Sequence, residues 1–200
     1  MAGKERLVVI GGVAAGMSAA SSAKRLRPEM EVTVLEKDEH ISYGACSLPY
    51  YISDEIKDIK SLLALTPESA EKERGIKVNT RHEAFSVDKN NKEVVAKDLE
   101  NEKEARFPYD KLVLATGGLP IVPKLPGVDL KNIFTIRTLG DGLAIKGYTD
   151  EEQPERAVIV GGGYIGMEMS ESLRKRGLEV TVLKRWIGSS ELWMRRSSRW

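Results

Sequence analysis

The sequence predicts an α/β protein built from two Rossmann-like dinucleotide-binding units, the second of them incomplete. Two observations lead to this prediction. A buried strand, a glycine-rich turn, a helix and a second strand follow one another within residues 7–36, and the same order returns within residues 157–183. The strands of both repeats are short apolar runs rich in β-branched residues, which is typical of parallel strands covered on both faces.

Composition places the chain among ordinary globular proteins. Of its 200 residues 41% are hydrophobic and 30% are charged, and its net charge is +1. So small a charge attracts neither nucleic acid nor an anionic membrane, and no apolar run is long enough to span a bilayer. The charged first residues are unlike a signal peptide, and a single cysteine suits a reducing compartment. We therefore expect a cytoplasmic protein that acts on a small molecule, with no nucleic-acid or membrane partner.

The first unit ends in an acidic residue. Its turn consists of Gly11, Gly12, Val13, Ala14, Ala15 and Gly16. Residues 17–27 are predicted to form a helix and residues 31–35 the second strand, which ends at Glu36. Free N–H groups at the helix start suit a pyrophosphate, and Glu36 can accept a hydrogen bond from a ribose hydroxyl. Val13 replaces the middle glycine of G-x-G-x-x-G, although Gly12 beside it offers similar backbone access. The alternative is an ordinary βαβ crossover with a glycine turn.

The second unit carries the complete G-x-G-x-x-G. Its turn includes Gly161, Gly163, Tyr164, Ile165 and Gly166. A strand is predicted over residues 157–160, a helix over 167–176 and a strand over 179–183. Two such units indicate two nucleotides. The simplest pair of cofactors is FAD and the NAD(P)H that reduces it.

The segment between the units predicts several smaller elements. A helix is expected to start at residues 66–68, with Pro67 at its first position, and to run to residue 74, where Gly75 ends it. A strand is expected at 76–78, and a hairpin of strands 83–88 and 93–98. A buried strand then ends in the small residues Ala115, Thr116 and Gly117. Prolines interrupt residues 120–127, a short helix is expected at 141–146, and a polar boundary loop at 149–155. The predicted domains are a FAD-binding domain over residues 1–153, the first βαβ unit of an NAD(P)-binding domain over 154–184, and an atypical tail over 185–200.

Cys46 is the only cysteine, and it follows shortly after the first unit. Free cysteines are usually packing residues, but the two nucleotide signatures favour a redox role. His40 and His82 are the only histidines. No cysteine or carboxylate cluster has the spacing to join them, so no metal site is predicted.

These motifs together resemble flavoprotein pyridine nucleotide–disulfide oxidoreductases of the single-cysteine branch, which includes coenzyme A-disulfide reductase, NADH oxidase and NADH peroxidase. The resemblance covers residues 5 to about 184. It is most specific in the pattern S-x-x-x-C-x-x-P-Y, formed by Ser42, Cys46, Pro49 and Tyr50. The dithiol branch of the superfamily is excluded, because that branch needs a second cysteine at this place.

The resemblance implies a role for each motif. FAD would be held by the first glycine turn, by Glu36 and Lys37, by the backbone around Ala84, and by Ala115 to Gly117. The second turn would bind NAD(P)H, with Tyr164 stacked over the flavin until the nicotinamide displaces it.

Cys46 would receive the electrons and pass them to coenzyme A disulfide, or to peroxide or oxygen through a sulfenic acid. The matching substrate positions are Ser18, Ser22, Arg25, Ser42 and Ala45. Ala45 replaces the asparagine that is frequent in the family. Full-length relatives are expected to be homodimers.

The end of the chain departs from the family. Lys184 and Arg185 stand where an acidic residue usually binds the nicotinamide-side ribose, and a basic pair there could instead accept a 2′-phosphate. Three tryptophans and a cluster of arginines follow. This tail predicts either an amphipathic membrane or partner helix or, as we favour, a truncated or out-of-frame end. Two other functions therefore stay open: a non-catalytic nucleotide-binding remnant, and a flavoprotein that transfers electrons without Cys46.

Overall fold

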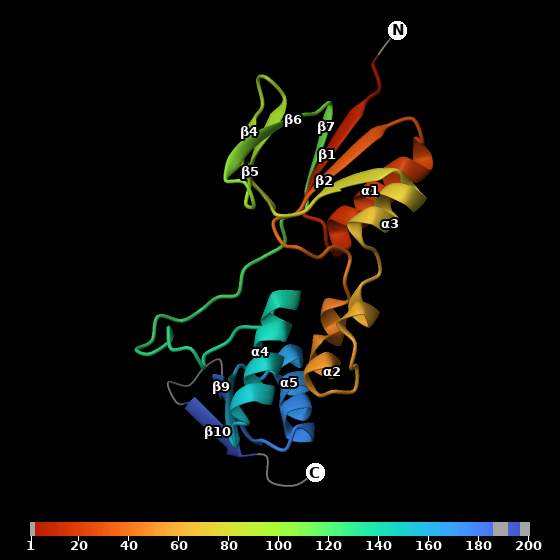
Figure 1. The fold of residues 1–200 in the computed structure, drawn as a ribbon. Coiled ribbons are helices and arrows are strands. Elements are labelled where there is room, and N and C mark those ends of the chain that lie inside the picture. The colour runs from red at the N-terminus through yellow and green to blue at the C-terminus, as the bar shows by residue number, and fades with distance from the viewer. Residues whose placement is uncertain (1–2, 186–191, 197–200) are drawn as a thin grey trace. The chain divides into compact units, whose positions relative to one another are not determined.

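The computed structural model describes residues 3–185 and 192–196 (Figure 1). Two compact units divide the chain. The first unit contains residues 1–44 and 63–119, and the second contains residues 45–62 and 120–200. The segment with Cys46 thus clusters with the second unit, although both of its flanks belong to the first. The predicted domain bounds at 153 and 184 were placed from the sequence motifs and differ from the bounds of these compact units. They stay a prediction.

The first unit is organised around a parallel sheet in the order β3-β2-β1-β7. Its strands are β1 (Arg6–Ile10), β2 (Glu31–Leu35), β3 (Ile76–Asn79) and β7 (Lys111–Leu114). Helices α1 (Ala14–Leu26) and α3 (Pro67–Arg74) cover one face, with Val9 and Val34 fully buried beneath them (Figure 1). This is the predicted βαβ unit, in which Val9 of β1 pairs in register with Val34 of β2.

A small antiparallel sheet supports the other face of the parallel sheet. It consists of β4 (His82–Asp88), β5 (Glu93–Asp98) and β6 (Lys103–Pro108) in sequential order. Val94 and Ala96 of β5 pack against Val8 and Leu35. The predicted hairpin is confirmed, whereas β6 was missed. Its residues alternate between exposed and half-buried, and the charged residues of the exposed face hide the strand pattern.

The second unit repeats the βαβ order. Strand β8 (Arg156–Val160) pairs in parallel with β9 (Glu179–Arg185), and α5 (Tyr164–Lys175) joins them. Helix α4 (Leu139–Glu152) and the short helix α2 (Leu48–Ile52) lie beside α5 (Figure 1). Two 3-10 turns, η1 (Ala45–Ser47) and η2 (Ile59–Leu62), flank the α2 segment. The fold class predicted from the two repeats is therefore confirmed.

Among the residues that the structure describes, one face of strand β8 is exposed. In β8 the inward side chains of Ala157 and Ile159 pack against the core of the unit, while Val158 and Val160 are 63% and 72% exposed. Alternation of this kind is expected of a strand that is covered on one side only. The predicted incompleteness of the second unit is visible in these two valines.

The helix before β8 is longer than predicted. Instead of a short helix and a loop, residues Leu139–Glu152 form the single helix α4. A capping box begins it, because Asp141 N donates to Thr138 Oγ1 over 3.2 Å and Thr138 N donates to Asp141 Oδ2 over 2.8 Å. The helix continues through Thr149, which is buried and whose hydroxyl donates to the Ile145 carbonyl over 2.8 Å. Polarity alone had suggested a loop here.

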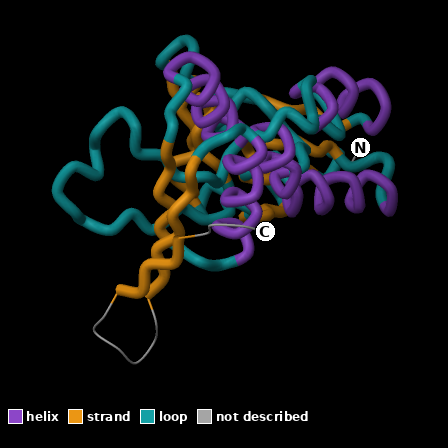
Figure 2. The backbone as a smooth tube through the Cα atoms, turned by 90° about the horizontal axis from the view of Figure 1, so that it is seen from below, coloured by secondary structure: helices purple, strands orange, loops and turns teal. Residues whose placement is uncertain are grey.

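The tail contains one described element. The backbone of β10 (Leu192–Arg196) pairs antiparallel with β9, and Figure 2 shows the two strands side by side. A tail helix is therefore wrong over residues 192–196. Trp186 and Trp200 lie outside the described residues. No helix among the residues that the structure describes is long and apolar enough to cross a membrane.

Candidate functional site: two glycine turns, an arginine-lined pocket and one cysteine

The first glycine turn lies at the carboxyl end of β1, where the backbone has no room for side chains. Gly11 adopts a φ of 103°, and a Cβ there would clash with the Ala115 carbonyl oxygen. A Cβ on Gly16 would clash with the Gly11 carbonyl oxygen. The turn therefore brings strand β1, helix α1 and the end of β7 closer than any larger residue permits.

The start of helix α1 offers unsatisfied donors. No side chain caps it at Val13, and its first turn holds no acidic residue. Ala14 and Ala15 are exposed. The N–H groups of a helix start without such partners bind anions, so the residues present suit the pyrophosphate of a dinucleotide.

Glu36 lies buried beside this turn. Its Oε2 accepts from Gly12 N over 2.6 Å, and its Oε1 accepts from Asp38 N over 3.0 Å. An ionised carboxylate has about four acceptor positions, so two remain for ribose hydroxyls. Lys37, the next residue, is exposed.

Other predicted FAD residues share this edge of the first unit. The His82 N–H donates to the Glu36 carbonyl over 2.9 Å, which starts β4 two residues before Ala84. Ala115 N donates to the Ile10 carbonyl over 2.8 Å, and Thr116 and Gly117 follow, both exposed. The structure thus brings the first turn, Glu36, Ala84 and residues 115–117 to one edge of the first unit. The edge of a doubly wound sheet where its order reverses is where such folds bind dinucleotides.

The second glycine turn repeats this geometry within the second unit. Gly161 adopts a φ of 126°, and a Cβ on Gly166 would clash with the Gly161 carbonyl oxygen. Helix α5 begins at Gly163 without a side-chain cap. Tyr164 is 93% exposed, and Ile165 beside it is exposed as well. This turn also suits a pyrophosphate.

Lys184 occupies in the second unit the place that Glu36 has in the first. Gly11 N donates to the Leu35 carbonyl and Gly161 N to the Leu183 carbonyl, each over 2.8 Å. The residue that follows each of these leucines then packs over the second glycine of its turn, Glu36 over Gly12 and Lys184 over Gly162. A Cβ on Gly12 would lie 3.0 Å from Glu36 Cβ, and one on Gly162 would lie 3.0 Å from Lys184 Cδ. Equivalent positions in the two units thus carry opposite charge.

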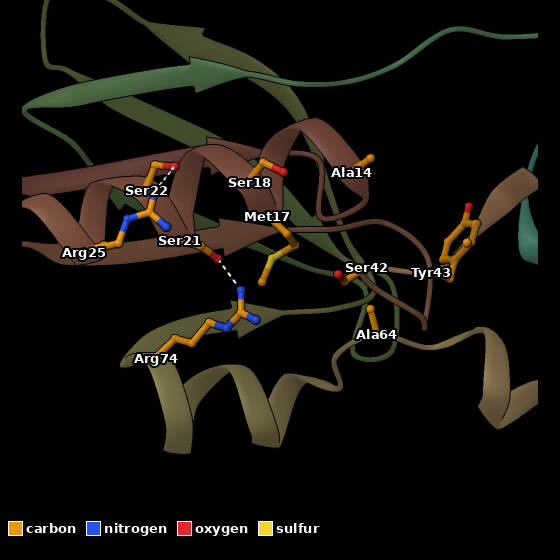
Figure 3. A pocket seen from close by; sticks show the side chains of 11 residues that line it. Ala14, Met17, Ser18, Ser21, Ser22, Arg25, Ser42, Tyr43, Ala64 and Arg74 are labelled. Carbon is orange, nitrogen blue, oxygen red and sulfur yellow. Dashed lines mark hydrogen bonds between the residues drawn. The ribbon is translucent and has the colours of Figure 1, made fainter.

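A pocket of about 410 Å³ opens beside α1 in the first unit (Figure 3). Its lining is rich in hydroxyl and guanidinium groups and consists of Ala14, Met17, Ser18, Ser21, Ser22, Arg25, Ser42, Tyr43, Gly44, Ala64 and Arg74. Four of the five predicted substrate residues are among them. The fifth, Ala45, is not, but Gly44 directly before it is.

Arg74 is the charged pocket residue that sequence reasoning missed. It comes from the last turn of α3, and its Nη1 donates to Ser21 Oγ over 2.8 Å (Figure 3). Arg25 Nη2 donates to Ser22 Oγ over 3.4 Å. Two guanidinium groups thus line one pocket. The sequence carried no signal for Arg74, because 49 positions separate it from Arg25.

Cys46 is exposed and lies in η1, directly before α2. Two peptide units separate it from Gly44, which lines the pocket. Two residues of extended chain span at most about 7 Å, so the covalent chain keeps the backbone of Cys46 within that distance of Gly44. Among the described residues no group of three His, Cys, Asp or Glu side chains could hold a metal ion.

Comparison with known proteins agrees with this geometry. The family model described as pyridine nucleotide-disulphide oxidoreductase matches residues 5–188. The chain belongs to this family. Its predicted membership is confirmed, and the family supports the predicted use of FAD and NAD(P)H.

Relatives of the chain carry related names. An "NAD(P)H sulfur oxidoreductase (CoA-dependent)" of Pyrococcus abyssi is 42% identical over 182 residues, covering 91% of this chain and 40% of that protein. A coenzyme A disulfide reductase of Staphylococcus haemolyticus is 34% identical over 180 residues, covering 90% and 40%. The crystal structure of reduced Bacillus anthracis CoADR-RHD matches with a TM-score of 0.86 and 39% identity, covering 90% of this chain and 32% of that one. The chain thus spans about 40% of the length of these curated relatives.

Proposed function

We propose that this chain carries the FAD site, the substrate pocket and the redox cysteine of an NAD(P)H-dependent reductase of coenzyme A disulfide or a related sulfur compound. The observation that carries the proposal is the pocket beside α1. It gathers Ser18, Ser22 and Arg25 of α1 with Ser42 of a later segment, and two peptide units join Gly44 at its rim to Cys46. Two arginines suit the phosphates of coenzyme A, because guanidinium groups bind phosphate oxygens in pairs.

The covalent step needs only one protein sulfur. The Cys46 thiolate attacks one sulfur of the disulfide, so that a Cys46–coenzyme A disulfide bond forms, the original S–S bond breaks, and one coenzyme A leaves as a thiolate. Two electrons then release the second coenzyme A and restore the Cys46 thiolate. FAD held by the first glycine turn and Glu36 would supply these electrons from NAD(P)H.

The remaining predicted residues bind and orient the two nucleotide cofactors. We assign Gly11 to Gly16, Glu36, Lys37, Ala84 and residues 115–117 to FAD, and Gly161 to Gly166 to the nicotinamide dinucleotide. Lys184 favours a nucleotide with a 2′-phosphate, because an ammonium group attracts phosphate where a carboxylate would repel it. We also propose a cytoplasmic location, given the single cysteine, and a homodimer for the complete protein.

The test is a titration of the purified chain supplied with FAD. We expect flavin absorbance to be retained after gel filtration, to bleach on addition of NADPH more readily than NADH, and to recover on addition of coenzyme A disulfide. Cys46→Ser should retain the bleaching and lose the recovery.

Two outcomes would point elsewhere. A colourless chain that cannot be reduced would be a non-catalytic nucleotide-binding remnant. Recovery that persists in Cys46→Ser would indicate an electron acceptor that does not use this sulfur.

A further inference from the structure

We propose that Asp54, Lys146, Asp150 and Arg176 form a charge network that positions Cys46 for reaction with a bound disulfide. These four are positioning residues, because none of them is the reacting group. The inference rests on the proposed function in one respect, namely that Cys46 attacks coenzyme A disulfide.

Apolar packing first anchors helix α2, which follows Cys46, to the second unit. Ile52, at the end of α2, is fully buried in a core that also contains Ile145 of α4 and Leu173 of α5. Leu48, at the start of α2, packs on α4 so closely that a Cβ on Gly142 would lie 2.8 Å from Leu48 Cδ2. The segment with the cysteine thus packs on both helices (Figure 1).

The chain turns sharply where α2 ends. Asp54 adopts a φ of 65°, a left-handed conformation that residues other than glycine rarely take. Ser53 is buried and its hydroxyl donates to the Tyr50 carbonyl over 3.1 Å. Such a backbone persists where its surroundings hold it, so the contacts of Asp54 decide where α2 ends.

Two cations form ion pairs with the Asp54 carboxylate. Lys146 of α4 binds Oδ1, and Arg176, just after α5, binds Oδ2. Both cations also bind Asp150 of α4, Lys146 over 3.6 Å. Lys146 lies 5.4 Å above the Tyr51 ring, and Arg176 Nη1 lies 3.4 Å from the Ile52 carbonyl oxygen. One network therefore joins the end of α2 to α4 and α5.

Burial distinguishes this network from ordinary surface pairs. The side chains of Lys146 and Arg176 are only 14% and 16% exposed, whereas their partners Asp54 and Asp150 are 47% and 45% exposed, so solvent and salt screen the network only in part. By contrast, Lys175 pairs with Glu55 at 2.6 Å and with Glu171 at 3.0 Å, and its side chain is 42% exposed. The ion pairs of Asp54 thus have less exposed cations than the pair of Glu55 beside it.

The consequence for reactivity follows from continuity of the chain. Residues 45–52 form one 3-10 turn and one helix without a gap, with Cys46 at one end and the network at the other. Loosening the far end lets the whole segment move. None of the four residues of the network lines the pocket, so such movement slows the exchange step at Cys46 and leaves binding in the pocket unchanged.

The experiment measures single-turnover exchange between the reduced chain and coenzyme A disulfide as a function of disulfide concentration. The key variant is Asp54→Asn, because asparagine tolerates the left-handed backbone and removes only the charge. Arg176→Met removes the bridging cation, and Arg176→Lys keeps a charge. Asp110→Asn is the matched control, since Asp110 also pairs with an arginine, Arg6, at similar exposure but in the first unit.

We expect the maximum rate to fall about tenfold in Asp54→Asn and Arg176→Met, with the half-saturating concentration unchanged and Arg176→Lys intermediate. Asp110→Asn should match the wild type. Iodoacetamide, a small reagent that needs no bound position, should alkylate Cys46 at the same rate in all of these chains.

The inference is overturned if Asp54→Asn exchanges at the wild-type maximum rate, or if its half-saturating concentration alone changes. If Arg176→Met does not fold, Asp54→Asn decides. A wild-type chain whose exchange rate does not saturate would contradict the proposed substrate itself. Saturation in the wild type with normal variants would contradict only the network.

Discussion

At the residue scale, the first unit combines groups of opposite charge for different parts of its ligands. The buried carboxylate of Glu36 accepts from the backbone of Gly12 beside the glycine turn, whereas Arg25 and Arg74 line the pocket on α1. Carboxylates select hydroxyl donors and guanidinium groups select phosphates. A dinucleotide ribose and the phosphates of a second ligand can therefore be recognised within one unit.

Arg74 should contribute to the binding of coenzyme A. We expect Arg74→Met to raise the dissociation constant for coenzyme A about five- to tenfold, because a charge-assisted hydrogen bond to phosphate is lost. Isothermal titration at two salt concentrations measures both the affinity and its salt dependence, which should weaken in the variant. Arg27→Met is the control, since Arg27 pairs with Glu5 over 2.6 Å outside the pocket. Equal affinities in Arg74→Met and Arg27→Met would contradict the assignment.

Some of these residues were predictable from the sequence and others were not. Glycine turns leave local signatures, because their spacing relative to strand and helix is what the backbone geometry demands, and both turns were found. Four pocket residues were found only through a family resemblance. Arg74 and Ser21 escaped because their proximity depends on how α3 packs beside α1, and no local pattern encodes that packing.

At the element scale, the helices of the second unit are joined by ion pairs as well as by apolar packing. The Arg176 guanidinium, which binds Asp150, is the main cause of the lowered pKa of that carboxyl, and Lys146 adds to it. A carboxyl whose pKa is lower in the folded than in the unfolded chain stabilises the fold above its unfolded pKa. That stabilisation is lost as pH falls through the folded value.

Asp150 should therefore contribute stability at pH 7 that fades below about pH 4, the usual range of an aspartate pKa. We expect Asp150→Asn to lower the free energy of unfolding at pH 7 by up to about 1 kcal/mol, since the carboxylate is partly exposed and screened. Urea unfolding of both chains from pH 7 down to about pH 3.5 measures the difference, which should shrink toward the acid end. A difference that stays constant with pH would show that charge pairing is not its cause.

Strands and helices were predicted best where apolar residues recur at regular spacing along the sequence. The βαβ strands and helices were found, whereas α4 was divided into a helix and a loop. Its last turns bury Ile145 and Thr149, and the Ile145 carbonyl accepts from the buried Thr149 hydroxyl, a burial that side-chain polarity does not indicate. Tertiary contacts therefore determine the length of α4.

At the scale of the whole molecule, the second sheet exposes an apolar face. Val158 and Val160 of β8 are exposed, and so are Tyr164, Ile165 and Met167 at the start of α5. Exposed apolar surface of this kind favours association. The chain spans about 40% of the length of its curated relatives, so the association state of this chain can differ from theirs.

We expect the purified chain to self-associate as its concentration rises. The double variant Val158→Thr with Val160→Thr should shift the equilibrium toward the monomer, because threonine keeps the strand preference and lowers the apolar area. Sedimentation velocity over a range of concentrations measures this. Leu26→Gln, at an exposed position in α1, is the control and should sediment like the wild type. Identical association in all three chains would mean that another surface is responsible.

The most direct test of the central claim is the intact mass of the reduced chain after reaction with coenzyme A disulfide. The account predicts the addition of one coenzyme A, bound through a disulfide to Cys46, absent from Cys46→Ser and removed by a thiol reductant. An unchanged mass in the wild-type chain would contradict it.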